Sequence, residues 1–513
     1  MKTPLLGSSY VARSVNAADS RMVNLFPEAI PEGGKEAGFL QRCPGLSLLA
    51  NIGTGPIRGL WSFSSDSAVA FVVSGTELHK IGTSYSPTLL GTIAGTGPVS
   101  MADNGTQLFI AANGPGYIYN NTTGAFGQIS DPDFPGAVTV GYIDGYFVFN
   151  QPNSQLIWVT SLLDGTTIDP LEFASAEGSP DGVVGIVVDH REVWVFGTNS
   201  IEVWYDSGAT DFPLQRIQGA FNEIGCAAAY SIAKMDNGLF WLGSDARGRG
   251  IVYRANGYTG QRISTHAVEW QVQQYGDLSD AIGYTYQQDG HAFYVLVFSS
   301  ANTTWVYDVA TQAWHERAGW TDGAFTRHRS NCQMVFNDQI IVGDYATGKI
   351  YAFDPDVYAD DGQIQKWLRS WRALPTGQNN LKRTSHHSLQ LDCESGVGLD
   401  VEPDYDGGNP IATETSIEIT TETGEVIVTS EYVVGAVGYN PQAMLRWSDD
   451  GGHTWSNEHW TGMGPIGQTG RRVIWRRLGM TTKLRDRVYE ISGTDPVKIA
   501  VMGAELLLSG TNA

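Results

Sequence analysis

The chain is poor in basic residues and in charge overall. Charged residues make up 17% of its 513 positions, and 54 acidic side chains against 32 basic ones give a formal net charge of -22. This imbalance argues against a protein that binds nucleic acid tightly, because such binding needs a basic surface. It does not argue against a conduit, since an acidic wall repels phosphate and keeps DNA from sticking.

Cysteine and long apolar runs are also scarce. The four cysteines, Cys43, Cys226, Cys332 and Cys393, lie far apart, without the C-x-x-C or Cys/His spacing of a zinc site. Reduced, mostly buried thiols fit this pattern, and disulfides stay an alternative. No apolar run approaches the roughly 18 residues of a membrane helix, and the N-terminal stretch lacks a signal-peptide core. We expect a soluble chain without a membrane span, made in the cytoplasm.

Sequence motifs typical of enzymes are missing. The sequence contains no G-x-S-x-G elbow, phosphate loop or dinucleotide fingerprint. Its ten histidines are scattered, and the adjacent His386 and His387 would face opposite sides of a strand. Residues 354–363 offer oxygen ligands of the kind calcium prefers, but they depart from the EF-hand pattern and lack its distal glutamate. We interpret this loop as a solvated turn, and we predict no catalytic residue, no metal and no cofactor.

Helical periodicity is nearly absent, and a β-repeat stands in its place. From about residue 55, short alternating runs are separated by Asn, Asp and Gly. Seven units align on their first turns, which are 38 to 52 residues apart. The turns lie at Asp66, Asn104-Gly105, Asp144-Gly145, Asp189-His190, Asn237-Gly238, Asp289-Gly290 and Asn337-Asp338. A four-stranded propeller blade takes about 40 to 50 residues, so the repeat predicts a β-propeller of six or seven blades.

The fold class is therefore all-β, with three parts along the chain. Residues 1–45, rich in Pro and Gly, read as an extended N-terminal arm. Residues 46–375 hold the propeller repeats, and a terminal strand can complete the last blade. Residues 376–513 change character and predict an additional C-terminal β-domain, with a hairpin around Thr423-Gly424.

One short motif points to carbohydrate chemistry. Residues 448–455, SDDGGHTW, fit the Asp box S-x-D-x-G-x-T-W of sialidases. Asp450 can accept bonds from backbone N–H groups, Gly452 permits positive φ, and Trp455 can pack beneath the turn. A sialidase also needs converging arginines and a tyrosine nucleophile, and its boxes repeat between blades, whereas this one is single. We interpret Ser448, Asp450, Gly452 and Trp455 as a structural turn.

Basic residues gather at one place near the C-terminus, which we name the arginine cluster. Its members, within 17 positions, are Arg471, Arg472, Arg476, Arg477, Lys483, Arg485 and Arg487. In a strand, Arg472 and Arg476 would share one face, with Arg471 and Arg477 on the other. A solvated or salt-bridged strand pair is one interpretation. The other is a contact with an acidic neighbouring subunit or with DNA phosphate, the subunit being favoured.

Several longer stretches together resemble a known family. They are VNLFPE followed by FLQRCPGL, then SPDGVVGIVVDHREVWVFGTNSIEVWYDSGA, SLQLDCESGVG and the closing RRVIWRRLGMTTKLRDRVYEISGTDPVKIAVMGAELLL. In this order they resemble the packaged-DNA stabilisation proteins of short-tailed bacteriophages, the tail hub or nozzle below the portal and its adaptor ring. The match spans almost the whole chain.

The resemblance implies a structural protein with a propeller and added β-domains. Proteins of this kind form a six-fold ring around the tail channel, seal packaged DNA in the capsid and form part of the ejection channel. The implied partners are other copies of the chain, the portal–adaptor ring, distal needle or fibre proteins, and double-stranded DNA in passage. The implied place is the virion tail, after assembly in the bacterial host cytoplasm. The family has no catalytic residues to transfer.

Two alternatives stay open at this point. The propeller, the Asp box and the 15 tryptophans fit a phage carbohydrate-binding or sialidase-like, glycan-degrading tail protein. A generic propeller scaffold of a bacterial cell is the other alternative. The phage-like terminal stretches argue against that scaffold, because a bare propeller has no need of them.

Overall fold

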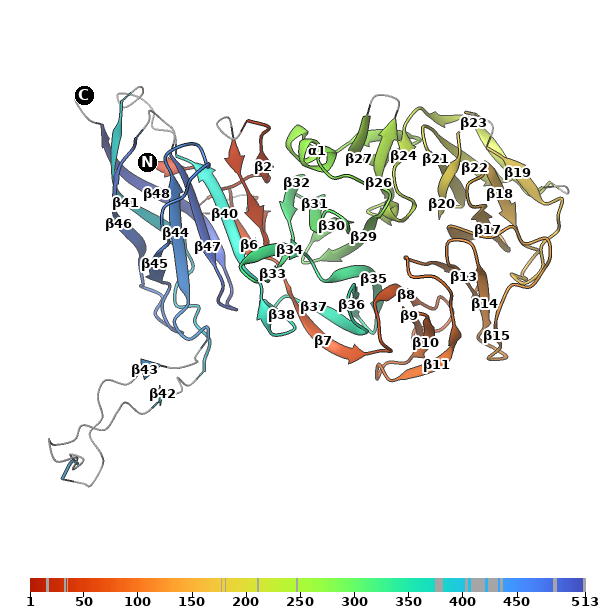
Figure 1. Ribbon diagram of the computed structural model, residues 1–513, viewed down its shortest axis with the longest axis horizontal. Helices are drawn as coiled ribbons and strands as arrows, with labels where there is room; N and C mark the ends of the chain where they lie inside the picture. The colour runs from red at the N-terminus through yellow and green to blue at the C-terminus, as the bar shows by residue number, and fades with distance from the viewer. Residues whose placement is uncertain are drawn as a thin grey trace. The chain divides into compact units, whose positions relative to one another are not determined.

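Nearly all of the regular structure is β-strand, as the alternating sequence pattern predicts (Figure 1). The computed structural model describes residues 1–14, 18–31, 34, 36–176, 178–179, 181–209, 212–245, 248–373, 382–401, 405–406, 420–422, 432–433, 437–482 and 487–510. The contacts group the chain into two units. The propeller unit holds residues 7–26 and 43–363, and the sandwich unit holds residues 1–6, 27–42 and 364–513.

The propeller unit contains seven blades, at the upper end of the expected six or seven. Each blade is an antiparallel sheet whose strands follow one another in sequence, except in the last (Figure 1). The first four blades are β8 (Ile57–Ser62), β9 (Ala70–Ser74), β10 (Glu77–Ile81) and β11 (Pro87–Thr92); β12 (Ser100–Asp103), β13 (Gln107–Ala111), β14 (Gly116–Asn120) and β15 (Phe126–Gln128); β16 (Val140–Ile143), β17 (Tyr146–Asn150), β18 (Leu156–Val159) and β19 (Phe173–Ser175); and β20 (Val183–Asp189), β21 (Glu192–Gly197), β22 (Ile201–Asp206) and β23 (Leu214–Asn222).

The remaining blades complete the circle. They are β24 (Gly225–Cys226), β25 (Ala233–Met235), β26 (Gly238–Asp245), β27 (Gly248–Asn256) and β28 (Thr259–Arg262); β29 (Ala281–Gln288), β30 (His291–Phe298), β31 (Thr303–Asp308) and β32 (Ala313–Glu316); and β35 (Ser330–Phe336), β36 (Gln339–Asp344), β37 (Lys349–Asp354) and β7 (Gly45–Asn51). The outer strand of blade 7 is thus β7, from the other end of the repeat. It pairs antiparallel with β37, with Leu46 opposite Phe353. This pairing closes the propeller and leaves neither end strand unpaired.

The predicted turns join the first two strands of the blades. At Asp144-Gly145 both residues have positive φ, 45° and 104°, as a two-residue type I′ hairpin turn requires. Asp289 (52°) and Asn337 (53°) also have positive φ. Asn and Asp tolerate this conformation because their short polar side chains bond locally, which is why the sequence places them here.

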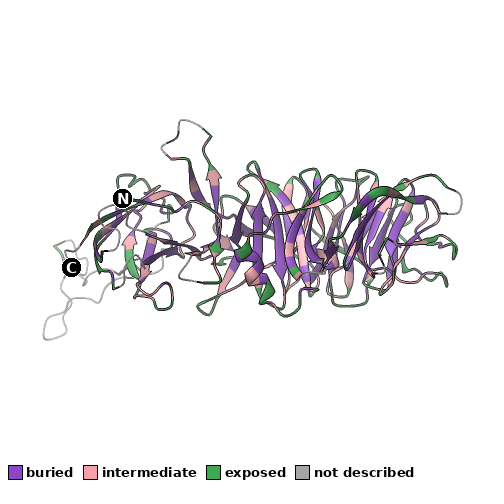
Figure 2. Ribbon diagram, turned by 90° about the horizontal axis from the view of Figure 1, so that it is seen from above, coloured by how far each residue is buried: buried purple, intermediate pink, exposed green. Residues whose placement is uncertain are grey.

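The propeller core lies between blades. Seven hydrophobic clusters, one at each junction of neighbouring blades, hold the buried side chains. Phe109 of blade 2 lies 5.8 Å from Phe149 of blade 3, ring centre to ring centre. Phe240 of blade 5 and Tyr294 of blade 6 stack at 5.3 Å. The strands are mostly buried, while exposed residues gather in the loops (Figure 2).

Shorter elements complete the propeller unit. Helix α1 (His266–Gln273) begins at Thr265, whose side chain accepts from the Val268 N–H. It is the sole α-helix among the described residues, and none of their helices is long and apolar enough to cross a membrane. The other short elements are η1 (Ala229–Ser231), β2 (Tyr10–Val11), β3 (Asp19–Ser20), β4 (Met22–Val23), β33 (Ala318–Thr321), β34 (Ala324–Arg327), β38 (Ala359–Asp360) and β39 (Gln363–Ile364).

Among the described residues, the sandwich unit contains two larger antiparallel sheets and the two-stranded antiparallel sheet β42-β43. One larger sheet has the order β46-β41-β48-β6, with β1 also on β48, and the other has the order β40-β47-β44-β45. His386 of β41 bonds the Tyr489 hydroxyl of β47, and the Trp475 indole of β46 donates to the His459 carbonyl of β45. The strands are β1 (Lys2–Thr3), β5 (Leu25–Ala29), β6 (Gly38–Arg42), β40 (Trp367–Arg372), β41 (Thr384–Cys393), β42 (Tyr405–Asp406), β43 (Tyr432–Val433), β44 (Gln442–Ser448), β45 (His459–Gly462), β46 (Val473–Met480), β47 (Val488–Gly493) and β48 (Ala500–Gly510).

The N-terminal segment takes part in both units. In the sandwich unit, β1 and β6 pair with β48, so the first residues lie in a sheet with the last strand. The expected domain boundaries, after residues 45 and 375, stay a prediction. The hairpin expected around Thr423-Gly424 lies outside the described residues.

Candidate functional site

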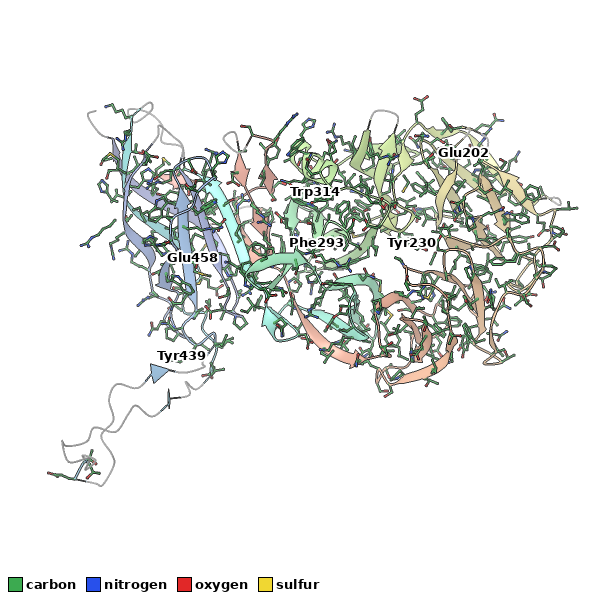
Figure 3. All side chains as sticks on the ribbon, viewed as in Figure 1. Glu202, Tyr230, Phe293, Trp314, Tyr439 and Glu458 are labelled. Atoms are coloured by element: carbon green, nitrogen blue, oxygen red, sulfur yellow. The ribbon has the colours of Figure 1, made fainter. Side chains whose placement is uncertain are left out.

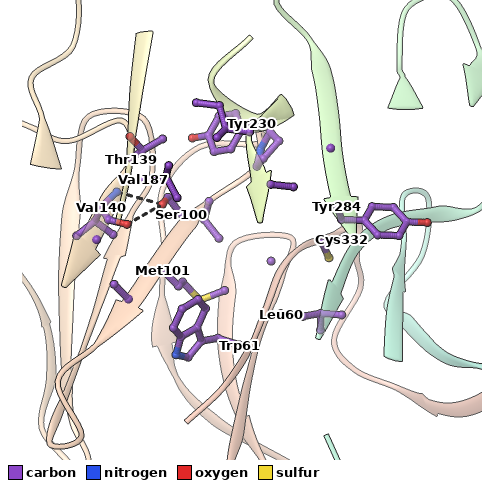
Figure 4. Close-up of a pocket in the computed structure, with 18 of the residues that line it drawn as sticks. Leu60, Trp61, Ser100, Met101, Thr139, Val140, Val187, Tyr230, Tyr284 and Cys332 are labelled. Carbon is purple, nitrogen blue, oxygen red and sulfur yellow. Dashed lines mark hydrogen bonds between the residues drawn. The ribbon is translucent and has the colours of Figure 1, made fainter. Parts of the chain in front are cut away.

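A cavity of about 540 Å³ lies at the centre of the propeller, where the first strands of the blades face one another (Figure 4). Its lining is mostly apolar and includes Leu60, Met101, Val140 and Val187. The Ser100 hydroxyl, which accepts from the Val140 N–H at 3.1 Å, ties two of these strands together. A cavity of this size suits a small molecule and cannot pass a nucleic-acid duplex.

Most polar groups of the central cavity are already engaged, whereas the buried Oδ1 of Asn331 has no hydrogen-bond partner among the described residues. The nitrogens of Arg58 donate to three backbone carbonyls at 2.6 to 3.0 Å. The Tyr230 hydroxyl points to the Val138 carbonyl at 3.4 Å, and burial raises the pKa of Tyr230 to about 12. The carboxylate of Asp103 accepts from the Trp61 indole at 2.7 Å. These groups serve the propeller walls, and they do not form a nucleophile–base pair.

The Asp-box turn connects β44 with β45. Asp450 accepts from the Ser448 hydroxyl (2.7 Å), from the Thr454 N–H (2.8 Å) and, on its second oxygen, from the Thr454 hydroxyl (2.6 Å). These bonds, led by those from Thr454, hold the pKa of Asp450 far below its usual range. Gly451 and Gly452 have φ of 79° and 98°. Both carboxylate oxygens are therefore occupied by the turn itself.

Trp455 lies beside the strand that leads into the turn. The guanidinium of Arg446 lies over the Trp455 ring, 4.7 Å from its centre. Arg446 also pairs with Glu490 of β47 at 2.5 Å. The tryptophan thus stacks on an ion pair of the sandwich, a contact that stabilises the hairpin without any substrate.

The arginine cluster does not form one continuous surface. Arg471, Arg472, Arg476 and Arg477 are exposed, on or just before β46. Arg487 is 2% exposed, and its guanidinium bonds both oxygens of Asp449 at 2.6 and 2.7 Å. Lys483 and Arg485 lie outside the described residues.

A β-bulge explains why both faces of β46 present arginine. Ser388 of β41 pairs with Arg476, and His386 pairs with Gly479, so two residues of β46 oppose one of β41. Arg477 occupies the bulge with φ of 60°. Arg472 and Arg476 share one face, as the alternation predicts, while Trp475 on the other face is buried.

The remaining candidates have structural partners. In the acidic loop, Asp354 accepts from the Ser47 hydroxyl at 3.0 Å and Asp361 pairs with Lys349 at 2.5 Å. The other acids of this loop are Asp356 and Asp360. Within the described ranges, no three His, Cys, Asp or Glu side chains are grouped to hold a metal ion. The four cysteines are free, and burial raises the pKa of Cys226 to about 11.

Sequence reasoning missed an uneven distribution of charge. No Lys or Arg occurs between Lys80 and Arg191, whereas this stretch contains ten Asp and Glu residues. We name residues 81–190 the acidic sector. It covers β11, the whole of blades 2 and 3, and β20. A scan for runs without one charge sign would have found it in the sequence.

A second missed feature lies within the acidic sector. Four large apolar side chains of blade 3 are exposed on the segment around β19, and we name them the leucine ridge. They are Leu162 (59% exposed), Leu163 (63%), Leu171 (78%) and Phe173 (40%). The exposed fraction of Leu171 is the highest among the large apolar side chains of the described residues. Single exposed leucines are ordinary, but four exposed large apolar side chains on one short segment make it a candidate contact surface.

These observations define the class of protein: a closed seven-bladed propeller joined to a β-sandwich, in which the candidate site residues described above serve structural contacts. Many large aromatic side chains, among them Phe293 and Trp314 of blade 6, are buried in the core (Figure 3).

Comparison with known proteins identifies the family. The family model described as bacteriophage P22 Gp10, beta-propeller, matches residues 1–358, and the model described as bacteriophage P22 Gp10, beta-sandwich, matches residues 408–508. The chain belongs to this family of short-tailed phage tail hub proteins.

The individual proteins that match this chain share little sequence identity with it. The tail hub protein gp10 of Salmonella phage P22 is 24% identical over 289 residues, which are 54% of this chain and 59% of that protein. Among solved structures, the computationally designed Ika8 protein matches with a TM-score of 0.37 and 13% identity, over 61% of this chain and 99% of its own. The Pan2 WD40 domain of Neurospora crassa matches with a TM-score of 0.38 and 9% identity, over 58% and 88%. Nothing about this chain follows from scores that low.

Proposed function

We propose that this chain is a structural component of the tail of a short-tailed bacteriophage, the hub or nozzle that seals packaged DNA in the capsid. The observation that carries the proposal is the paired match, propeller and sandwich in the same order, to the two parts of P22 Gp10. In this role the chain needs no catalytic residue and no cofactor.

The proposal includes a ring of copies, six in number by analogy with similar proteins, that lines part of the ejection channel. The central cavity of a single propeller, about 540 Å³, is too small for DNA, so a channel requires several chains around a shared axis. The net charge of -22 suits such a channel because an acidic wall does not retain phosphate during passage.

The proposed partners follow from this place in the particle. On one side the ring meets the portal–adaptor ring, and on the other it meets distal needle or fibre proteins. Assembly takes place in the cytoplasm of the bacterial host, and the mature protein resides in the virion tail. The only nucleic acid in this scheme is the double-stranded DNA that passes through.

The glycan-degrading alternative is less well supported. Both oxygens of Asp450 are used by the turn that contains it, and Arg446 is engaged by Glu490 and Trp455. Arg446 therefore offers no free guanidinium to a sialic-acid carboxylate, and Asp450 offers no free carboxylate oxygen to a substrate.

The test is DNA retention in particles made by a phage with a nonsense mutation in this gene. Heads that fill, then lose their genome, without a completed tail, would support the hub role. Stable, DNA-filled particles that only fail to adsorb or to degrade host glycan would overturn it and favour the glycan-degrading alternative. Supplying the full chain in trans should restore retention.

A further inference from the structure

The described residues present two surfaces of opposite charge. One belongs to the propeller unit and the other to the sandwich unit, and each carries exposed apolar side chains beside its charges. We propose that these surfaces bind each other between neighbouring copies, so that the leucine ridge of one copy docks on the arginine-bearing sheet of the next. The proposal rests on the ring of copies in the proposed function and names the contact that builds it.

The first surface is the leucine ridge in its acidic surroundings. The Leu163 N–H donates to the Gly145 carbonyl at 2.8 Å, which fixes this turn against the first hairpin of blade 3. The ring centres of Phe173 and Trp158 are 4.9 Å apart, so the Phe173 ring packs on Trp158 although the side chain stays partly exposed. The ridge is thus held in place by these contacts while its apolar side chains stay exposed on the propeller unit.

Acidic residues lie on the loops next to the ridge, and the nearest bases in sequence are Lys80 and Arg191, of which Arg191 pairs with Asp144. Asp131 accepts from the Ile168 N–H at 3.1 Å, which brings the loop with the exposed Asp133 next to the segment of the ridge. Burial raises the pKa of Glu172, and Asp169 raises it further. The raised pKa is the effect expected for a partly buried carboxyl group with a second carboxylate nearby. A partner for this surface must carry positive charge at the rim of an apolar centre.

The second surface carries two exposed arginines and one glutamate beside exposed or half-buried apolar side chains, around the polar Ser388 and Gln390 of its central strand. Across β46, β41 and β48, Arg476, Ser388 and Leu507 are cross-strand neighbours, and so are Ile474, Gln390 and Glu505. Residues two apart on a strand share a face, so these six side chains form one surface, extended by Arg472 through its bond to Gln390. We name it the basic face. Leu507 is 62% exposed, and Arg472 and Arg476 are exposed beside it.

The basic face lies at a sheet edge that is closed to strand addition. β46 is the last strand of its sheet in the described order, with β41 on its inner side. Its bulge at Arg477 and its arginines disfavour pairing with a further strand, as edge strands of natural sheets usually do. Recognition at this place therefore uses side chains on the face rather than backbone hydrogen bonds at the edge.

The complementary charges of the two surfaces favour a second copy of this chain as the binding partner. One chain supplies an acidic apolar surface and a basic apolar surface, and both occur in every copy. A contact between two different surfaces of identical chains is heterologous, and repetition of it generates a closed ring when the rotation fits. Charge at the rim fixes the register and steers association, while the leucines supply the buried area.

The experiment uses two charge-reversed chains in the nonsense-mutant phage described above. Variant one is Arg472→Glu with Arg476→Glu, and variant two is Asp133→Lys with Glu172→Lys. No hydrogen bond of the Asp133 or Glu172 side chain is needed by the local turns that the structure describes, so the fold should tolerate these changes. A matched control reverses two exposed charges elsewhere on the propeller, Arg249→Glu with Asp356→Lys.

The readout is the amount of the chain in purified particles, together with DNA retention. Each variant alone places like charges across every contact, and we expect incorporation to fall at least about tenfold. Supplied together, the two variants can alternate around an even-numbered ring, because each contact then joins opposite charges. We expect this mixture to recover to within about twofold of the wild-type chain, and the control variant to match wild type.

Every other result counts against the inference. Normal incorporation of either variant alone would overturn it while leaving the proposed function intact. Loss with each variant and no recovery in the mixture would mean that the two surfaces bind other molecules, such as DNA or another tail protein, or contact each other only within one chain. Failure of the wild-type chain itself to enter particles would instead overturn the proposed function. Soluble expression of each variant with an unchanged thermal unfolding midpoint is the folding control.

Discussion

At the scale of single residues, Arg487 differs from the exposed arginines on and before β46, because its side chain is buried and bonded. It is 2% exposed and bonds Asp449 with two nitrogens, and a third contact reaches the Leu478 carbonyl at 2.8 Å. These bonds outweigh the cost of burial, and the pKa of Arg487 is raised. The same cluster therefore contains one arginine that stabilises the sandwich and several that face outward.

Replacing Arg487 by Met should destabilise the sandwich unit by about 3 kcal/mol, because Asp449 and a buried carbonyl lose their partner. Hydrogen exchange of the β47 amides measures the loss. Arg476→Met, on the exposed face, is the matched control and should change stability by no more than about 0.5 kcal/mol. Similar effects of the two substitutions would contradict the structural role of Arg487.

His315 makes the propeller sensitive to acid. Burial, and next the nearby Arg317, lower the pKa of His315 to about 3. The ring packs on Phe26 and Phe293, and neither nitrogen has a hydrogen-bond partner among the described residues. The folded state thus keeps His315 neutral at pH values where an unfolded chain would protonate it.

Because the folded pKa is lowered, the stability that neutral His315 provides is complete above the unfolded pKa, near 6.5, and declines as pH falls towards the folded value. The slope is about 1.4 kcal/mol per pH unit over that window. His315→Leu removes the titrating group without removing a hydrogen bond, so thermal unfolding between pH 7 and about pH 4 should become less pH-dependent. An unchanged slope would show that other groups, such as His328 and His386, dominate the acid response.

At the scale of elements, the sequence predicted the hairpin turns but not the pairing of strands that lie far apart in the chain. Asp144-Gly145 and Asp289-Gly290 predict hairpin turns because the residues themselves favour positive φ. The partner of β7 lies about 300 residues away, and no local signal specifies it. Likewise, the alternation that places Arg472 and Arg476 on one face was predicted, while the bulge at Arg477 depends on pairing with β41.

The candidate site divides in the same way. The Asp box was predictable because Ser448, Asp450 and Thr454 bond within seven positions. The burial of Arg487 depends on Asp449, 38 positions away, and cannot be inferred from spacing. Exposure of the leucine ridge also escaped prediction, because an apolar run in a propeller repeat normally indicates a buried strand.

Strand β7 should be essential to the closed propeller. Leu46 is 1% exposed in the cluster between blades 6 and 7, and Leu46→Ala should cost about 2–4 kcal/mol. Leu48 lies on the same strand, opposite Tyr351, but is 48% exposed, and Leu48→Ala should be nearly neutral. Exchange protection of the β37 amides measures closure. Equal protection in the two variants would mean that β7 does not hold blade 7 in place.

At the scale of the whole molecule, acidic and basic residues are concentrated in different parts of the sequence rather than evenly distributed. The acidic sector contains ten acids and no base, whereas the arginine cluster places seven bases in 17 positions. Such sorting lets identical chains attract at one pair of surfaces while their remaining surfaces repel.

The full chain should not retain linear double-stranded DNA at about 0.15 M salt, because its net charge of -22 opposes phosphate. An electrophoretic mobility assay measures this directly. Saturable binding whose affinity falls steeply with salt would contradict the prediction, and it would shift the interpretation of the arginine cluster towards DNA.

The closure of the propeller by β7 also constrains how the chain is made. A ribosome that has finished β7 must still translate about 300 residues before β37 emerges, which takes about 15 to 60 s at bacterial speeds. In the sandwich unit, the interval between the synthesis of β1 and that of its partner β48 is longer still. A nascent chain therefore carries unsatisfied strand edges for most of its synthesis, and a polypeptide released before residue 349 cannot close its propeller. Even late truncations should thus yield aggregated or degraded fragments rather than partial hubs.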